Sequence, residues 1–348
     1  MLIVTPFVLN SFSSIKDIAQ ALDFSGRGYI PVCRGDGVLV GIVTDGDLRR
    51  AFISGGEDIA SVINTAPKTA SVDCNYSELH ALAKGTNRGV LILVDDDDRY
   101  KGVFDLSHER EKSAMTPVVI MAGGLGKRLG KLTEKTPKPM LTVSGKPVLQ
   151  IIIEKLAAQG FKNISLAVNY LSSQISEFFA TGENFNVNIS YIEEKKRMGT
   201  AGALSLIDDI PEHPIIVMNA DLLLDIDYSD LLFHHYQSGA EITVVTKEHS
   251  QQIEYGVVSV ADDSQIKGIQ EKPSHFFKIS AGVYVVSPSV LAMIPPDSFF
   301  DMPELVNLAI SSNRKCCYYN AGGFWLDIGR EKDLNYARKY FMKMEGEM

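Results

Sequence analysis

The feature that most constrains the fold is a glycine-rich segment in the middle of the chain, residues 118–141. Its first four residues, 118–121, are apolar, and the glycines Gly123, Gly124 and Gly126 follow almost at once. A short apolar run that ends in glycines predicts a buried strand that leads into a loop. Because glycine has no Cβ atom, the backbone N–H groups of such a loop can approach an anion closely. We therefore expect a phosphate-binding loop here.

Five cations follow this loop: Lys127, Arg128, Lys131, Lys135 and Lys138. The glycine spacing is neither that of the dinucleotide-binding fingerprint nor that of the P-loop, which needs Gly-Lys-Ser/Thr. A solvated basic loop is the alternative interpretation of the segment.

Composition limits the protein class. The 348 residues are enough for two domains with real cores. The net charge of −9 argues against nucleic acid or an anionic membrane as the main partner. No apolar run reaches the roughly 18 residues of a membrane helix. The cysteines have no paired metal spacing and no signal peptide precedes them, so we expect reduced thiols in the cytoplasm: Cys33, Cys74, Cys316 and Cys317.

The N-terminal third contains an internal repeat. Residues 27–32 recur 61 positions later as 88–93, and 41–43 recur as 102–104. Each unit predicts an amphipathic helix (14–24, then 76–86), a strand, an acidic turn and a second strand. Residues 108–117 are charged, end at a proline and predict a linker, so we expect domains at 1–113 and 114–348.

Beyond the glycine loop, predicted strands and helices alternate. Strands are expected at 164–168, 189–192 and 215–218, and helices at 172–180, 200–207 and 331–344. This α/β alternation predicts a mostly parallel sheet covered on both faces, with ligands beyond the carboxyl ends of its strands. Asn219 to Asp221 would then lie at the site. No histidine has the spacing of a ligand or base, and His234 and His235 are expected on a surface helix.

The glycine segment, together with Pro137-Lys138-Pro139 and Gly145-Lys146-Pro147, resembles the signature of the sugar-1-phosphate nucleotidyltransferases. The resemblance implies a Rossmann-like sheet and Mg²⁺-dependent transfer of a nucleotidyl group from a nucleoside triphosphate to a sugar 1-phosphate. It implies catalysis by Arg128, Lys138 and Lys272 through alignment and charge neutralisation, without acid–base residues. The family usually has Thr where this chain has Lys127.

The resemblance also implies the binding residues. For the nucleotide they are Ala122, Gly123, Gly124, Gly126, Lys127, Glu194, Gly199 and Thr200. For the sugar phosphate they are Gly256, Glu271, Lys272, Ser280, where the family usually has Asn, and Gly282. Asp221 and Asp327 would hold the metal, because two converging carboxylates repel each other without a cation.

Glu194 is the residue that the resemblance places at the Watson–Crick edge of the base, five residues before Gly199. A carboxylate only accepts hydrogen bonds, which suits the adjacent N1–H and N2–H₂ donors of guanine. GTP is therefore favoured, with UTP or dTTP as alternatives, and Glu193 is the alternative base-reading residue. The expected acceptor is glucosamine 1-phosphate in a cell-surface sugar pathway, with mannose and heptose 1-phosphates as alternatives.

Residues 41–50 look like the core motif of a CBS domain, so residues 1–113 resemble an α/β CBS tandem. The resemblance implies an adenine nucleotide bound through Thr44 and Asp47, whereas Asp105 and His108 stand at these positions in the second unit. A structural, dimer-forming module is the alternative, and a homo-oligomer is expected. The rival to an enzyme is a regulatory protein whose degenerate transferase domain only binds sugar nucleotide.

Overall fold

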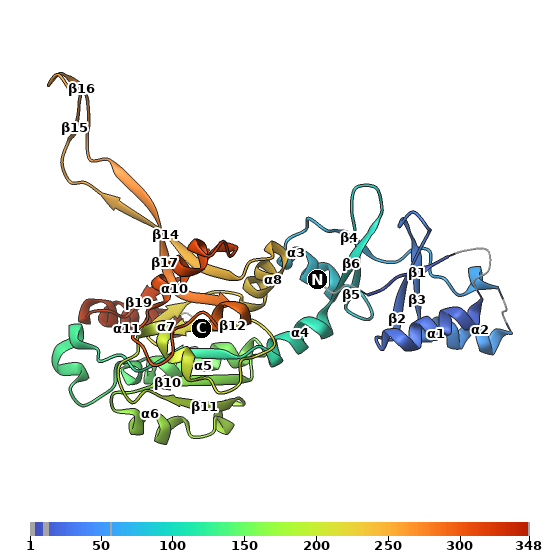
Figure 1. The fold of residues 1–348 in the computed structure, drawn as a ribbon, viewed down its shortest axis with the longest axis horizontal. Helices are drawn as coiled ribbons and strands as arrows, with labels where there is room; N and C mark the ends of the chain where they lie inside the picture. The colour runs from blue at the N-terminus through green and yellow to red at the C-terminus, as the bar shows by residue number, and fades with distance from the viewer. Residues whose placement is uncertain (1–3, 10–13, 56–57, 347–348) are drawn as a thin grey trace. The chain divides into compact units, whose positions relative to one another are not determined.

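The computed structural model describes residues 4–9, 14–55 and 58–346 (Figure 1). The chain divides into two compact units, Met1–Lys112 and Ser113–Met348.

The N-terminal unit contains two three-stranded sheets of the same design. They consist of β1 (Phe7–Val8), β2 (Tyr29–Cys33) and β3 (Leu39–Thr44), and of β4 (Thr69–Ser71), β5 (Val90–Val94) and β6 (Tyr100–Asp105). In each sheet the first two strands are parallel and the last two are antiparallel. The register shifts between Val32 and Cys33 in one sheet and between Leu93 and Val94 in the other, which are equivalent positions of the repeat. The predicted internal repeat is therefore a structural repeat.

Helices α1 (Ile15–Ser25), α2 (Asp45–Ser54), α3 (Tyr76–Lys84) and α4 (Leu106–Met115) complete this unit. Ser14, Thr44 and Asn75 begin the first three helices with capping boxes, in which an acidic residue three positions on bonds back to the cap. The predicted linker at 108–117 is helical as far as Met115, and the division between the two units, Lys112 to Ser113, falls within it. Its charged residues are good helix formers, and its proline stands just beyond the helix end.

The C-terminal unit is built on a seven-stranded sheet in the order β11-β10-β7-β12-β17-β14-β18. The strands are β7 (Val118–Met121), β10 (Asn163–Val168), β11 (Asn188–Glu193), β12 (Ile215–Asn219), β14 (Ile242–Gln252), β17 (Ser274–Val286) and β18 (Cys316–Asn320). Strand β17 is antiparallel to both neighbours, and the other neighbouring pairs are parallel. The expected mostly parallel α/β sheet is confirmed.

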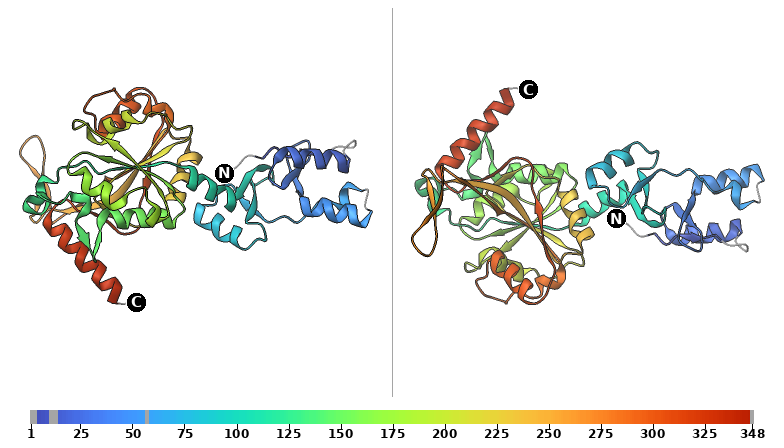
Figure 2. Two further views of the ribbon diagram at one scale, coloured as in Figure 1. Left: turned by 90° about the horizontal axis from the view of Figure 1, so that it is seen from below. Right: turned by 90° about the horizontal axis from the view of Figure 1, so that it is seen from above.

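Helices cover both faces of this sheet (Figure 2). One face packs α5 (Val148–Ala158), α6 (Ser172–Phe179) and α8 (Tyr228–Ser238) against alternate residues of β7, Val118 and Ile120. The other face packs α9 (Pro288–Leu291), α10 (Met302–Ser311) and the turn at α7 (Gly199–Gly202) against Val119. Since a strand points successive side chains to opposite faces, its continuous apolar run fits this two-sided burial.

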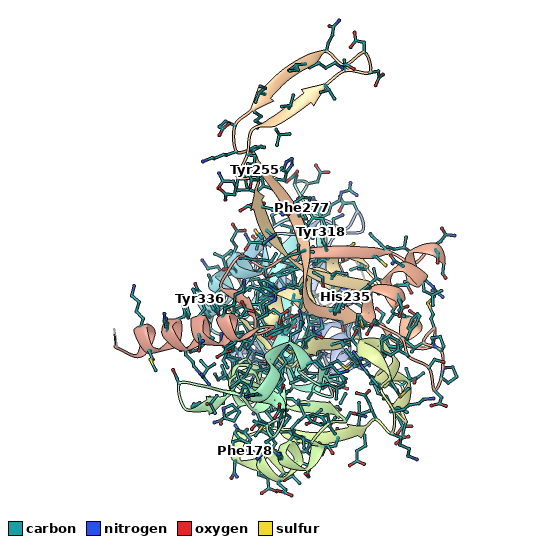
Figure 3. All side chains as sticks on the ribbon, turned by 90° about the vertical axis from the view of Figure 1, so that its left-hand side faces the viewer. Phe178, His235, Tyr255, Phe277, Tyr318 and Tyr336 are labelled. Carbon is teal, nitrogen blue, oxygen red and sulfur yellow. The ribbon has the colours of Figure 1, made fainter. Side chains whose placement is uncertain are left out.

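Strands β14 and β17 continue beyond the sheet as a two-stranded ribbon, from Thr246 paired with Ser280 to Gln252 paired with Ser274. A smaller hairpin, β15 (Val257–Val260) and β16 (Ile266–Gln270), extends it (Figure 1). We call residues 247–279 the arm. Figure 3 shows Tyr255 and Phe277 on it, away from the body of the unit.

The remaining elements complete the C-terminal unit. They are β8 (Thr142–Val143), β9 (Lys146–Pro147), β13 (Leu222–Leu224), β19 (Trp325–Asp327) and α11 (Glu331–Gly346). Among the described residues, no helix is long and apolar enough to cross a membrane.

His235 corrects one expectation. It lies on α8 but is 1% exposed, and its ring nitrogens bond the hydroxyls of Thr243 (2.8 Å) and Ser287 (3.2 Å). The sequence placed it on a surface helix, because a pair of adjacent histidines does not indicate which of the two faces the sheet.

Candidate functional site

A pocket of about 180 Å³ opens at the carboxyl edge of the parallel strands. Its lining residues are Met121, Gly123, Gly124, Glu194, Arg197, Gly199, Thr200, Asn219, Asp221 and Asp301. Strands β7 and β12 run parallel and in register, with Met121 opposite Asn219, so the segments that follow them emerge side by side. The structure thus brings together seven residues predicted from the sequence: Gly123, Gly124, Glu194, Gly199, Thr200, Asn219 and Asp221.

The glycine loop begins where β7 ends. Ala122 is buried, and its N–H donates to the carbonyl of Ala167 (2.8 Å). A Cβ atom on Gly123 would lie 2.6 Å from Oε1 of Glu194, so only glycine leaves room for that carboxylate. Gly126 has a φ of 63°, and its carbonyl accepts a hydrogen bond from the Thr133 hydroxyl (3.0 Å). The loop is thereby closed on itself, while Gly124 stays open, with no atom within 4 Å of its Cβ position.

The first two cations after the loop are exposed. Lys127 and Arg128 start a 3₁₀ segment, Lys127–Thr133, and both are exposed. The guanidinium of Arg128 passes 3.6 Å from the Cβ position of Gly329, two residues after Asp327. Neither Lys127 nor Arg128 lines the pocket itself, but Arg128 faces the segment that carries the second predicted metal ligand.

Lys138 joins the two predicted metal carboxylates. Its Nζ forms an ion pair with Asp221 and lies 3.9 Å from Oδ1 of Asp327. Burial raises the pKa of Asp327, and the nearby Asp221 charge raises it further, whereas Lys138 and Arg128 lower it. The two carboxylates therefore converge, as the sequence predicted, and a cation already stands between them.

The β13–β19 ladder brings Asp327 to this position. Asp327 pairs with Leu222, the residue after Asp221, and the N–H of Ile328 donates to the carbonyl of Asp221 (3.0 Å). Two segments that are about a hundred residues apart in the sequence thus present their carboxylates at one point.

These carboxylates fit a hard divalent cation. Asp221 Oδ1 and Asp327 Oδ1 are buried and have no hydrogen-bond partner in the described part of the chain. That part also contains no cluster of three or more His, Cys, Asp or Glu residues able to hold a metal. Two carboxylates, with the remaining ligands supplied by water and substrate phosphates, is the arrangement that Mg²⁺ prefers over an all-protein cage.

Glu194 follows β11 and enters the pocket, whereas the neighbouring Glu193 is exposed and does not line it. Its Oε2 accepts the backbone N–H of Met198 (3.0 Å), and its Oε1 is turned toward Gly123. Burial raises the pKa of this carboxyl group. Of the two glutamates that the sequence left open, only Glu194 lines the pocket.

The turn at Gly199 and Thr200 is held by a residue that the sequence did not predict, Asp301. Its Oδ1 accepts both the backbone N–H (2.8 Å) and the hydroxyl (3.1 Å) of Thr200. A Cβ on Gly199 would lie 2.6 Å from the carbonyl of Phe300, so the two segments touch. Asp301 precedes α10 in an Asp-x-Pro-Glu sequence. This pattern predicts the N-terminus of a helix but gives no indication of a pocket.

Arg197 was missed as well. It lines the pocket, and its guanidinium carbon lies 5.7 Å from the centre of the Phe299 ring. The attraction between a cation and the face of an aromatic ring is modest, and it favours this position of the Arg197 side chain. Its position in a charged run after a strand gave no signal that distinguishes it from Lys195 and Lys196.

The predicted sugar-phosphate residues fall into two groups. Ser280 and Gly282 lie at the base of the arm, where the Cβ position of Gly282 is 2.9 Å from Nδ2 of Asn219. Gly256, Glu271 and Lys272 are exposed on the arm, with Glu271 Oε2 3.0 Å from the Cβ position of Gly256, and none of them lines the pocket. The structure does not bring this second group to the metal carboxylates, because the β14–β17 pairing continues outward in register.

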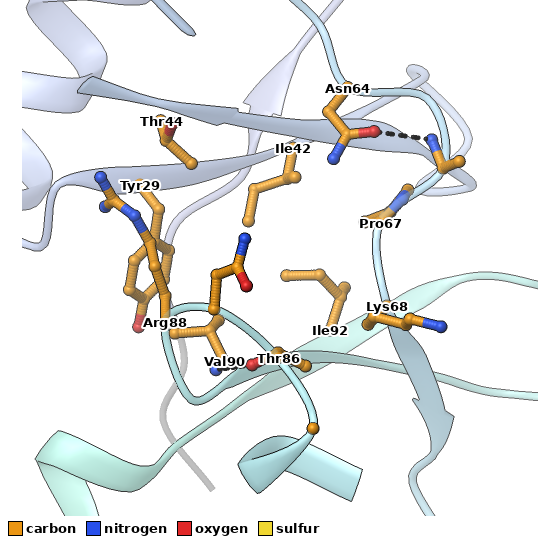
Figure 4. Close-up of a pocket in the computed structure, with 13 residues that line it drawn as sticks. Tyr29, Ile42, Thr44, Asn64, Pro67, Lys68, Thr86, Arg88, Val90 and Ile92 are labelled. Atoms are coloured by element: carbon orange, nitrogen blue, oxygen red, sulfur yellow. Dashed lines mark hydrogen bonds between the residues drawn. The ribbon is translucent and has the colours of Figure 1, made fainter. Parts of the chain in front are cut away.

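The N-terminal unit has a pocket of its own, of about 310 Å³, between its two repeats (Figure 4). Thr44, Lys68, Thr86 and Arg88 are among its lining residues. Asp47, predicted to contact the same nucleotide, does not line it. Its Oδ2 instead accepts the N–H (2.8 Å) and the hydroxyl (2.6 Å) of Thr44 at the start of α2. The two predicted residues are therefore in contact, but only Thr44 faces the pocket.

Comparison with known protein families gives two matches. Residues 117–343 match the family described as nucleotidyl transferase. Residues 3–54, which include the first of the two repeats, match the CBS domain.

Individual relatives match part of the chain. A mannose-1-phosphate guanylyltransferase catalytic subunit beta from Drosophila pseudoobscura pseudoobscura is 35% identical over 228 residues, 63% of this chain and 60% of that protein. A mannose-1-phosphate guanyltransferase from Schizosaccharomyces pombe is 35% identical over 223 residues, 62% of this chain and 61% of that protein. This chain thus spans about three fifths of the length of these curated relatives.

Among solved structures, HddC from Yersinia pseudotuberculosis, complexed with GMP-PN, superimposes with a TM-score of 0.51 at 26% identity. The match covers 65% of this chain and all of HddC.

Proposed function

Since this chain belongs to the nucleotidyl transferase family, we propose that it transfers a guanylyl group from GTP to a sugar 1-phosphate and releases pyrophosphate. One observation carries the proposal. Two buried carboxylate oxygens, on Asp221 and Asp327, have no hydrogen-bond partner among the described residues and lie beside Lys138 at the strand edge where the glycine loop begins. Such a site suits a metal-bound polyphosphate.

In the reaction, an oxygen of the sugar phosphate attacks the α-phosphorus of the triphosphate. The new P–O bond forms as the bond from the α-phosphorus to the bridging oxygen of the β-phosphate breaks, and pyrophosphate leaves with that oxygen. The nucleophile is already an anion at neutral pH, so it needs no general base. The chain's task is to align two polyanions and to neutralise the charge on the transferring phosphate.

Named residues divide this task. Lys138 and Arg128 bind the triphosphate, and the backbone N–H groups of Gly123 and Gly124 line its path. Asp221 and Asp327 would hold Mg²⁺, which supplies positive charge to the phosphate oxygens when bound. Lys272 binds the monoester phosphate of the sugar, a role that requires the arm to bend toward the pocket.

Guanine is supported by the names of the relatives and by the position of Glu194. Among the described residues, no donor bonds to its Oε1, which faces the pocket and can accept from the N1–H and N2–H₂ donors of guanine. The names of the relatives favour mannose 1-phosphate as the acceptor. Glucosamine 1-phosphate, expected from the fusion to a CBS module, and heptose 1-phosphate are the other candidates.

The rival function is a regulatory protein that binds a sugar nucleotide without turnover. The joint presence of Arg128, Lys138, Asp221 and Asp327 favours the enzyme, because a degenerate site would be expected to lose some of them. In the N-terminal unit, we propose that an adenine nucleotide binds at Thr44 with its phosphates near Lys68 and Arg88. We propose a cytoplasmic location for both activities.

A pyrophosphate-release assay tests the proposal. The full chain, with Mg²⁺, is given each of GTP, UTP, dTTP, ATP and CTP in combination with mannose, glucosamine and heptose 1-phosphates. The expected result is pyrophosphate and a GDP-sugar of matching mass with one acceptor. Absence of pyrophosphate from every pair, together with measurable binding of a sugar nucleotide, would favour the regulatory protein.

A further inference from the structure

Lys247 begins the arm. It is the first residue of β14 beyond the pairing with β18, and it still pairs with Ile279 of β17. Its Nζ donates to three successive backbone carbonyls, those of Ala321 (3.2 Å), Gly322 (2.9 Å) and Gly323 (2.7 Å). An ammonium group has three donors, so this contact uses all of them. The side chain is only partly exposed, and among the described residues it forms no ion pair with a carboxylate.

Three successive carbonyls that converge on one point place their partial negative charges close together. A flexible loop with two glycines would not keep that shape by itself, because glycine has the largest backbone freedom to lose. The fixed positive charge of Lys247 compensates for the convergence of the three oxygens. We therefore interpret the side chain as a clamp on residues 321–323.

The clamped loop leads directly to Asp327. Gly323 packs against Asp225, whose carbonyl oxygen would be 2.7 Å from a Cβ on that glycine. The N–H of Asp225 donates to the carbonyl of Phe324 (2.7 Å), and the indole N–H of Trp325 donates to the carbonyl of Ala281 (3.1 Å). The segment from residue 321 to Trp325 is thus held by Lys247 of β14, by Asp225 just after β13, and by β17 through the indole of Trp325. Asp327 follows two residues later.

We propose that Lys247 is a positioning residue, which sets the place of the Asp327 carboxylate and so the affinity of the site for its divalent cation. The proposal rests on the proposed function, since it assumes that Asp327 binds the metal. Groups that orient metal ligands from outside the coordination shell commonly change metal affinity by about 10- to 100-fold when they are removed. Lys247 touches neither the pocket nor Asp327, and it acts only through the loop.

The chain offers a local probe for the test. Trp325 is its single tryptophan and lies in β19, two residues beyond the clamped loop 321–323. Its fluorescence therefore reports on the segment without a label and without turnover. A matched control is also available, because Lys162 donates from Nζ to a single carbonyl, that of Asn186 (2.7 Å), at another edge of the unit.

The experiment compares the full chain with its Lys247→Met, Lys247→Arg and Lys162→Met variants. The first readout is acrylamide quenching of Trp325 without ligands. The second is the Mg²⁺ concentration for half-maximal pyrophosphate release, measured separately from the rate at saturating Mg²⁺. Thermal unfolding is recorded for each variant.

Lys247→Met should make Trp325 more accessible to acrylamide and raise the Mg²⁺ midpoint by about tenfold or more, while saturating Mg²⁺ restores most of the rate. In both readouts, Lys247→Arg should lie between Lys247→Met and the wild type. A planar guanidinium cannot direct three donors at three carbonyls that converge on one point. Lys162→Met should match the wild type in both readouts.

The proposal is overturned if Lys247→Met has a wild-type Mg²⁺ midpoint, or if its midpoint shifts only as much as that of Lys162→Met. If Lys247→Met does not fold, Lys247→Arg is judged by the same two readouts. A wild-type chain that releases no pyrophosphate would refute the proposed function instead. The quenching comparison, which needs no substrate, would still decide whether the clamp exists.

Discussion

Nζ of Lys138 lies 3.9 Å from Oδ1 of Asp327 while it is ion-paired with Asp221, so one ammonium group bridges the two carboxylates of the site. Lys138 cannot keep this position and also grip a triphosphate in the pocket. Under the proposed function, a divalent cation held by the two carboxylates would compensate their charge and leave Lys138 available to a phosphate. The bridge would then couple metal binding to nucleotide binding within one group of three residues.

The metal assignment predicts that Asp221→Ala and Asp327→Ala each remove most of the turnover and leave the fold intact. Each change removes one of two carboxylate ligands from a site that lacks a third. Pyrophosphate release at saturating Mg²⁺ measures the effect. Asp225→Ala is the matched control, since Asp225 is an exposed carboxylate that lies on the other side of the short strand β13 from Asp221. Near-normal rates in both site variants would rule out the two-carboxylate assignment.

The phosphate contacts predict a division between the two substrates. Arg128→Ala and Lys138→Ala should lower kcat/KM mainly for the triphosphate, and Lys272→Ala mainly for the sugar phosphate. A lost charge-assisted contact costs about 1.5 to 3 kcal/mol, or roughly 10- to 150-fold. Steady-state kinetics with each substrate varied in turn make the measurement. If Lys272→Ala changed only the triphosphate dependence, Lys272 would not contact the sugar phosphate, and the arm would have no reason to bend toward the pocket.

Base recognition predicts that Glu194→Gln weakens the preference for GTP over UTP and dTTP. The amide can donate as well as accept, so it no longer suits the paired donors of guanine alone. Burial raises the pKa of Glu194, so this carboxylate should take up a proton at a higher pH than an ordinary glutamate does. As the pH is lowered, the preference of the native enzyme for GTP should therefore decline earlier than it would with an ordinary glutamate. The ratio of kcat/KM values for the triphosphates is the readout, and Glu193→Gln is the control. A native preference for UTP or dTTP contradicts the assignment.

Local patterns predicted the parts of this molecule that depend on chain-local physics. An apolar run followed by glycines gave β7 and the loop, and a repeat at a fixed offset gave the paired sheets of the N-terminal unit. The parallel order of the strands then placed Asp221 correctly, because the carboxyl ends of parallel strands meet at one edge. Asp327 could be added only by family resemblance, since the β13–β19 pairing has no signal in the sequence.

Contacts between distant segments were beyond the sequence. Asp301 supports Thr200 from 101 positions away, and nothing near either residue indicates the pairing. Lys247 and the loop 321–323 are another such pair. The arm is a further example. The sequence indicates which residues form its two strands, but it does not indicate the direction in which the ribbon leaves the sheet. Gly256, Glu271 and Lys272 were therefore grouped with a pocket from which the structure separates them.

The N-terminal pocket predicts that Thr44→Ala and Arg88→Met weaken binding of an adenine nucleotide to the full chain. Thr44 also caps α2, so its loss costs about 1 kcal/mol of local stability, whereas Arg88 is not a helix cap. Calorimetric titration with AMP, ADP and ATP gives the affinities, and pyrophosphate release with and without the nucleotide gives the coupling. Arg34→Met, on an exposed turn of the same unit, is the control. No heat with any adenine nucleotide would leave this module a structural role.

The buried His235 predicts a pH-dependent stability that originates outside the active site. Burial lowers the pKa of His235 to about 4, and the nearby His234 contributes a smaller part of this shift. In the unfolded chain the pKa is about 6.5. The unfolded state therefore binds a proton first as the pH falls. The stabilisation is fully present above pH 6.5 and is lost between about pH 6.5 and 4, by about 3 kcal/mol in all.

Urea unfolding of the C-terminal unit, followed by Trp325 fluorescence at several pH values, measures this loss. His235→Gln should flatten the decline in this range after its fixed cost is subtracted, and His234→Gln should leave the slope nearly unchanged. Equal slopes in the wild type and His235→Gln would show that His235 is not the group responsible.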